Sequence, residues 1–171
     1  MYNPKTRVYL SHVFYGIFCL LTLFLQFSGL VTLKIGVALP MILVSLTIFA
    51  GMFFREWIGA VYGVLIGVTL DVVMDVPVGF NTVVLMLIGF LSGLLVTYLF
   101  NRNAYTMFVL NLLFTSFYFL LRWLFCYMPY SDTSYRMIGT VLVPQIIYTC
   151  VLGTVLYFFI SWLLSKINKI N

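Results

Sequence analysis

Two carboxylates, Asp71 and Asp75, stand four residues apart at the end of a long apolar stretch of the sequence. Two carboxylates that share a site can activate water for hydrolysis, and they usually come from separate elements. Residues four apart lie one turn apart on a single helix, which is poor geometry for such an attack. Carboxylates are nevertheless costly inside hydrocarbon, so this position indicates a defined role in the protein.

The other residues that could support catalysis or bind a metal lack suitable neighbours. His12 is the only histidine, and Cys19, Cys126 and Cys150 are isolated from one another in the sequence. None of the cysteines has the spacing of a metal site. The stretch GFLSG at 89–93 does not have the serine of a nucleophile elbow, and no phosphate-binding loop occurs. The sequence predicts that the protein is not an enzyme and needs neither a metal nor a cofactor.

Three glycines that precede Asp71 have the same spacing of four residues. The series reads Gly59, Gly63, Gly67 and Asp71, and a later apolar segment carries Gly89 and Gly93. On a helix this spacing places the glycines along one face, where another helix can approach backbone to backbone. The two glycine series could face each other inside the protein, or the face could receive the helix of a partner.

The composition defines the class of protein in which these residues act. Of 171 residues, 64% are hydrophobic and 8% are charged, and the mean hydropathy is +1.15. This composition predicts an all-α integral membrane protein with one domain over residues 1–171. Spans of about 20 residues leave only short connections. We expect six spans, at about 8–27, 37–54, 57–76, 79–100, 104–127 and 137–164.

The basic residues border the apolar segments and do not form a patch for nucleic acid. With the N-terminus in the cytoplasm, six of them lie inside and two outside, which predicts that both termini are cytoplasmic. The inside residues are Lys5, Arg7, Arg55, Arg102, Lys166 and Lys169, and the outside residues are Lys34 and Arg136.

The ninth basic residue, Arg122, lies within the fifth predicted span. Asp71 is roughly 9 Å of helix from the turn at Pro77, and Arg122 is roughly 8 Å from the outer end of its span. These depths match, so the sequence predicts a buried ion pair between Asp71 and Arg122. In the alternative, Arg122 extends outward to the interface while Thr69 or backbone groups satisfy Asp71.

The whole pattern resembles the rod shape-determining protein MreD family. The resemblance is carried by Arg55-Glu56, by the glycine series that ends at Asp71, by Pro77-Val78-Gly79, and by the closing segment 142–149 (LVPQIIYT). It implies a bacterial inner-membrane component of the cell-elongation machinery that lacks enzymatic activity. Its implied partners are the bitopic scaffold protein MreC, the RodA glycosyltransferase with its transpeptidase, MreB filaments indirectly, and membrane lipid.

The resemblance also implies a fold similar to the substrate-binding subunits of energy-coupling-factor transporters, which supplies an alternative function. A vitamin-binding subunit would present polar side chains around a pocket on its outer side. The residues that could do so are Asp71, Arg122, Asn81, Asn111 and Gln145. Such polar groups are few, and the outer loops are short for closing over a ligand.

Overall fold

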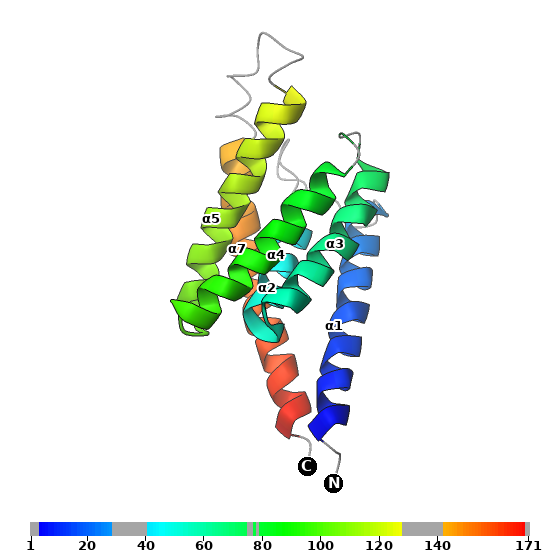
Figure 1. The fold of residues 1–171 in the computed structure, drawn as a ribbon, viewed down its shortest axis with the longest axis vertical. Helices are drawn as coiled ribbons and strands as arrows, with labels where there is room; N and C mark the ends of the chain where they lie inside the picture. The colour runs from blue at the N-terminus through cyan, green and yellow to red at the C-terminus, as the bar shows by residue number, and fades with distance from the viewer. Residues whose placement is uncertain (1–3, 29–40, 75–76, 78, 128–141, 170–171) are drawn as a thin grey trace.

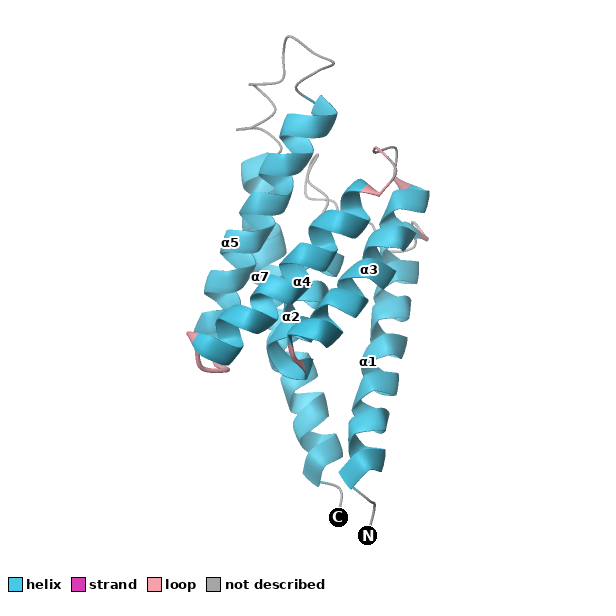
Figure 2. Cartoon of the chain, in the orientation of Figure 1, coloured by secondary structure: helices cyan, strands magenta, loops and turns pink. Residues whose placement is uncertain are grey.

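The computed structural model describes residues 4–28, 41–74, 77, 79–127 and 142–169, and the described residues form helices and short connections without a strand (Figures 1 and 2). This confirms the predicted all-α fold class. The helices are α1 (Pro4–Phe27), α2 (Ile42–Phe54), α3 (Glu56–Val73), α4 (Phe80–Tyr98), α5 (Ala104–Arg122) and α7 (Val143–Lys169), and a short π-helix η1 (Trp123–Tyr127) continues α5.

Helix α2 is the centre of the bundle. All eleven residues from Ile42 to Met52 are buried, and α2 contacts α1, α3, α4, α5 and α7. A helix that is apolar on every side is stable only where every side is covered by protein or lipid. With 13 residues it is about 20 Å long. The other five helices are long and apolar enough to cross a membrane.

Helices α3 and α4 form the most extensive helix pair and run side by side as an antiparallel hairpin (Figure 1). The turn between them ends at Gly79, whose φ of 88° lies in the left-handed region that glycine adopts without strain. Phe80 then begins α4, and its backbone N–H donates a hydrogen bond of 3.0 Å to the Pro77 carbonyl.

Two tyrosines join α1 to the rest of the bundle. The Tyr15 hydroxyl donates to the Leu46 carbonyl of α2, and the Tyr62 hydroxyl of α3 donates to the His12 carbonyl at 3.1 Å. The two tyrosine rings meet edge to face, with centroids 5.0 Å apart. Most of α1 otherwise faces outward, since only 11% of its apolar stretch Leu10–Phe27 is buried.

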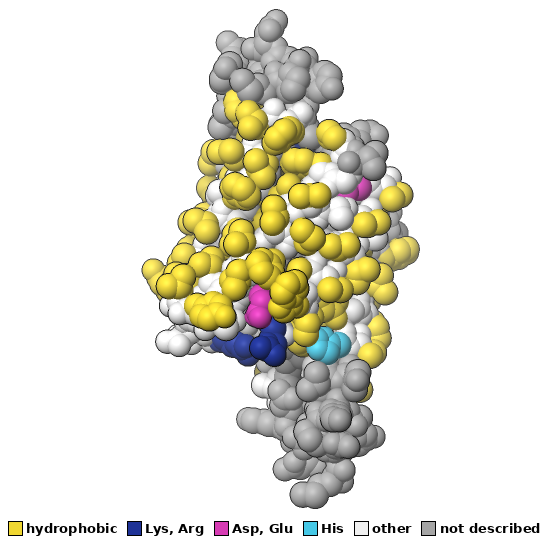
Figure 3. Space-filling model, in the orientation of Figure 1, with side chains coloured by type: hydrophobic (Ala, Val, Ile, Leu, Met, Phe, Trp, Pro, Cys, Tyr) yellow, Lys and Arg dark blue, Asp and Glu magenta, His cyan; other side chains and the backbone are white. Residues whose placement is uncertain are grey.

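The outer surface is a broad apolar band with basic residues toward one end (Figure 3). The beginning of α1, the α2–α3 link, the α4–α5 connection and the end of α7 all lie toward that end (Figure 1). Arg55 and Arg102 are exposed there. Arg55 alone links α2 to α3, with φ 102° and ψ 161°, a conformation almost restricted to glycine.

Candidate functional site: the glycine seam and its carboxylate cap

The glycines of α3 lie against the backbone of α4. A Cβ atom added at Gly63 would stand less than 3.0 Å from backbone atoms of Leu85 and Met86, and one at Gly67 would meet the backbone of Asn81 and Thr82 equally closely. Real Cβ contacts are never this short, so any side chain at these positions would force the two helices apart. Only glycine allows the observed approach.

The glycines of α4 complete the same contact from the other side. A Cβ atom at Gly89 would collide with the carbonyl group of Gly59 on α3, and one at Gly93 would stand 2.5 Å from the Cα atom of Glu56. The structure therefore brings together all five glycines that the sequence analysis singled out. They lie between two helices of the same chain. This is the arrangement in which the two glycine series face each other inside the protein.

A sixth glycine, Gly51 of the central helix α2, was missed by the sequence analysis. Its added Cβ atom would collide with the Gly89 carbonyl oxygen and the Ser92 hydroxyl, and a Cβ atom added at Gly59 would stand 2.5 Å from the Gly51 Cα atom. Three helix backbones thus meet at one place. We call these six residues the glycine seam: Gly51, Gly59, Gly63, Gly67, Gly89 and Gly93. A lone glycine among the large apolar residues of α2 was the only signal in the sequence.

Asp71 closes the seam at the start of α4. Its Oδ1 atom accepts the backbone N–H of Asn81 at 2.9 Å, and its Oδ2 atom accepts the backbone N–H of Thr82 at 3.1 Å and the Thr82 hydroxyl at 2.5 Å. The first N–H groups of a helix have no partner within the helix, and the helix dipole favours negative charge there. A side chain of α3 therefore caps the N-terminus of α4, which has no cap of its own at Gly79.

The structure gives Asp71 different partners from the predicted Arg122. Both carboxylate oxygens are used by α4, as in the alternative in which backbone groups satisfy the acid, while Thr69 donates to the Ile66 carbonyl. The depth estimate located the two charges along their helices but could not locate them around the helix axes. Asp75 lies outside the described residues.

Buried polar side chains tie the remaining helices together. The Asn81 side chain accepts the Tyr118 hydroxyl at 2.7 Å, linking α4 to α5. Asn111 of α5 accepts the hydroxyls of Ser45 on α2 and Thr115 on its own helix, each at 3.0 Å. These two asparagines therefore join α4 to α5 and α2 to α5, which is a packing role.

The five residues considered for a vitamin pocket differ in burial. Asn81, Asn111 and Gln145 are buried. Asp71 and Arg122 are partly exposed, and they come from different helices of the bundle. Within the described ranges, no group of three or more His, Cys, Asp or Glu side chains could hold a metal ion. The polar contacts described here hold the helices relative to one another.

Comparison with known proteins assigns the chain to a family. Searches of curated proteins and of solved structures returned no match, so the predicted likeness to transporter subunits stays a prediction. A family model does match, that of the rod shape-determining protein MreD, and it covers residues 6–167 of the 171. This confirms the resemblance seen in the sequence. The chain belongs to the rod shape-determining protein MreD family and is a multi-pass membrane protein of that family.

Proposed function

We propose that this protein acts in bacterial cell elongation by binding MreC in the cytoplasmic membrane. In this role it helps couple MreB filaments to peptidoglycan synthesis by RodA and its transpeptidase, and it performs no catalysis itself. The observation that carries the proposal is the family match over residues 6–167. The internal use of the buried polar groups supports a scaffold over an enzyme.

The proposed orientation places both termini and the Arg102 connection in the cytoplasm. It rests on the excess of basic residues at the end of the molecule where α1 begins and α7 ends. The turn between α3 and α4 then faces the outside of the cell, and so does the capped end of the seam.

The glycine seam and Asp71 enter this function through the fold. Their contacts are within the chain, so they hold α3 and α4 as one unit whose outward face is free for a partner. Along that face α3 carries exposed apolar residues, including Trp57, Leu65 and Val72. Seam variants should therefore lose folded protein and bound MreC together.

Depletion of the protein from its rod-shaped host tests the proposal. We expect rounded cells, restored by the wild-type chain, and MreC should copurify with it from native membranes. Gly63→Ile should fail in both assays, while the matched control Gly16→Ala should pass, since nothing lies within 4 Å of an added Cβ at Gly16. Cells that stay rod-shaped but require a vitamin, together with a copurifying vitamin, would contradict the proposal and support the transporter subunit.

A further inference from the structure

Glu56 carries an incompletely paired carboxylate at the end of the molecule where the basic residues gather. It begins α3 and lies against α4, because a Cβ atom added at Gly93 would stand 2.5 Å from the Glu56 Cα atom. Its Oε2 atom is buried and has no hydrogen-bond partner among the described residues. A buried carboxylate oxygen is costly to leave unpaired. The side chain is partly exposed, so a cation from outside the chain can reach the carboxylate.

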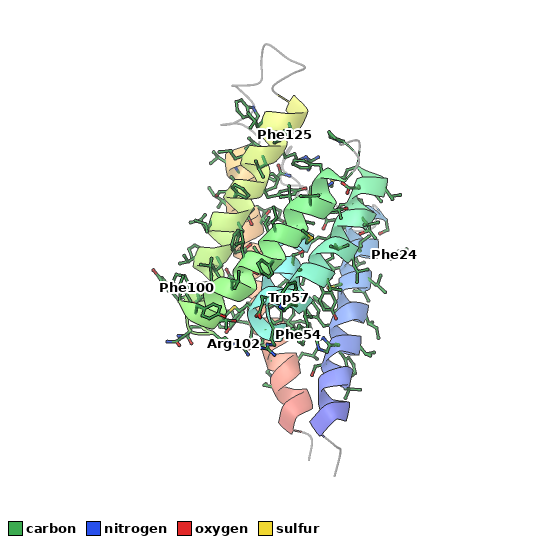
Figure 4. All side chains as sticks on the ribbon, in the orientation of Figure 1. Phe24, Phe54, Trp57, Phe100, Arg102 and Phe125 are labelled. Atoms are coloured by element: carbon green, nitrogen blue, oxygen red, sulfur yellow. The ribbon has the colours of Figure 1, made fainter. Side chains whose placement is uncertain are left out.

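Two exposed arginines lie on the same part of the surface. Arg55 precedes Glu56 in the chain, and Arg102 follows the end of α4. Figure 3 shows the acidic side chain at this end next to the basic side chains, and Figure 4 shows Arg102 at the same end as Trp57, the residue that follows Glu56. A guanidinium remains charged and binds phosphate oxygens through two parallel hydrogen bonds. The surface therefore presents one anion and two cations together.

An apolar surface adjoins these charges on the membrane side. Trp57 is 70% exposed, and its ring meets that of Phe90 on α4, with centroids 5.4 Å apart. Leu87 and Val83 are exposed and lie within about 60° of Phe90 around the axis of α4, so they continue the same face toward the middle of the span. An exposed tryptophan beside charged groups is typical of the level of the lipid headgroups.

We propose that this end of the α3–α4 hairpin is a binding site for phosphatidylethanolamine, a phospholipid with a primary ammonium group. Arg55 and Arg102 bind the phosphate, and Glu56 accepts hydrogen bonds from the ammonium group. The acyl chains lie along α4 from Phe90 onward. On the proposed orientation the lipid belongs to the cytoplasmic leaflet. The site goes beyond the role in cell elongation and does not require MreC.

The arrangement of charges favours this lipid over other occupants. A two-carbon spacer joins the phosphate and the ammonium group, so the headgroup carries opposite charges side by side, as the protein surface does. An anionic lipid would leave the Glu56 carboxylate unpaired. A lysine or arginine of a partner protein would be repelled by Arg55 and Arg102. A soluble zwitterion would leave the apolar face beside Phe90 unused.

Lipid titration of the purified full chain in detergent tests the site. We expect phosphatidylethanolamine to bind more tightly than phosphatidylglycerol, which has no ammonium group, and than phosphatidylcholine, whose trimethylammonium group has no N–H to donate. Native mass spectra measure the bound lipid, and the midpoint of thermal unfolding should rise most with phosphatidylethanolamine.

Three variants separate the two kinds of charge. Glu56→Gln should weaken the binding of phosphatidylethanolamine on the order of tenfold, since one charge-assisted contact is lost, and should not weaken that of phosphatidylglycerol. Arg102→Gln should weaken the binding of both lipids. The matched control Arg122→Gln, in the last turn of α5, should bind phosphatidylethanolamine like the wild type.

Three outcomes would overturn the site. The first is binding of phosphatidylglycerol or phosphatidylcholine by the wild type as tightly as phosphatidylethanolamine. The second is an unchanged preference for phosphatidylethanolamine in Glu56→Gln. The third is the same stabilisation by free phosphoethanolamine, which would show a site for a soluble zwitterion.

A crosslink to the unaltered chain covers the case in which Glu56→Gln does not fold. A membrane-permeant carbodiimide joins a carboxylate to an adjacent primary amine as an amide, with loss of one water. In native membranes we expect it to attach phosphatidylethanolamine to Glu56, identified by mass spectrometry after proteolysis. Asp71 is the internal control and should not be coupled, since its oxygens are bonded to the start of α4. A Glu56 that remains without lipid, or that is joined to a protein lysine, would refute the proposal.

Discussion

Asp71→Ala removes the cap that α3 provides to α4. The carboxylate accepts two backbone N–H groups and one hydroxyl, at 2.9, 3.1 and 2.5 Å. Loss of a helix cap costs about 0.5–2 kcal/mol, and loss of a hydrogen bond to a charged group costs about 1.5–3 kcal/mol. These effects overlap at one side chain, so we expect the free energy of unfolding to fall by about 2–4 kcal/mol.

Asp71→Asn separates the charge from the hydrogen bonds. Asparagine keeps one oxygen acceptor and caps helices well, so this change removes mainly the interaction with the helix dipole and should cost about 1 kcal/mol. Reversible unfolding of the purified protein in mixed micelles, titrated with a denaturing detergent, measures both variants. The order of stability should be wild type, then Asp71→Asn, then Asp71→Ala.

Double-mutant cycles identify the partner of Asp71. Asp71→Ala combined with Thr82→Val should be less destabilising than the sum of the two changes, because both remove the same bond. Asp71→Ala combined with Arg122→Gln should be additive, because both carboxylate oxygens of Asp71 are bonded to the start of α4. If the effects of Asp71→Ala and Thr82→Val add while those of Asp71→Ala and Arg122→Gln are strongly coupled, the cap is refuted and the Asp71–Arg122 ion pair is supported.

Three further predictions test the packing, the strained link and the orientation. Gly63→Ala should lower the free energy of unfolding by about 1–3 kcal/mol, whereas Gly16→Ala should not lower it, and detergent unfolding of both variants measures the difference. Arg55→Gly should raise the free energy of unfolding by about 1 kcal/mol, because glycine adopts the observed backbone angles without strain. An unchanged or lower free energy of unfolding would refute the strain at Arg55. Arg102→Cys in a background without other cysteines should react with an impermeant thiol reagent only after the cytoplasmic face is opened, and labelling of intact cells would reverse the topology.

The sequence was most informative where a local pattern determines the contact. The spacing of Gly59, Gly63 and Gly67 gives one helix face from helix geometry alone, and the matching pair Gly89 and Gly93 lies in the middle and second half of the next helix. Both series could therefore be assigned to helix faces, and a short turn made their meeting a reasonable expectation. The apolar composition likewise determined the membrane class.

The contacts that the sequence did not predict depend on rotation about helix axes and on distant segments. Asp71 and Arg122 were matched by depth alone, and depth says nothing of which way each side chain points. Gly51 has no periodic companion on α2, so its contact with Gly59 and Gly89 follows only from three-dimensional packing. The same holds for Tyr15, whose hydroxyl reaches a carbonyl 31 residues away.

Because α2 is central, the order in which the helices are synthesised determines when its contacts can form. Its neighbours come from both sides of it in the chain, with α1 made before it and α3, α4, α5 and α7 made after it. Even the backbone N–H of Met41, at its beginning, is bonded to the hydroxyl of Thr149, a residue synthesised 108 positions later. The core is therefore completed only when the last helix leaves the ribosome. Until then, the second helix must be sheltered by lipid or by the insertion machinery.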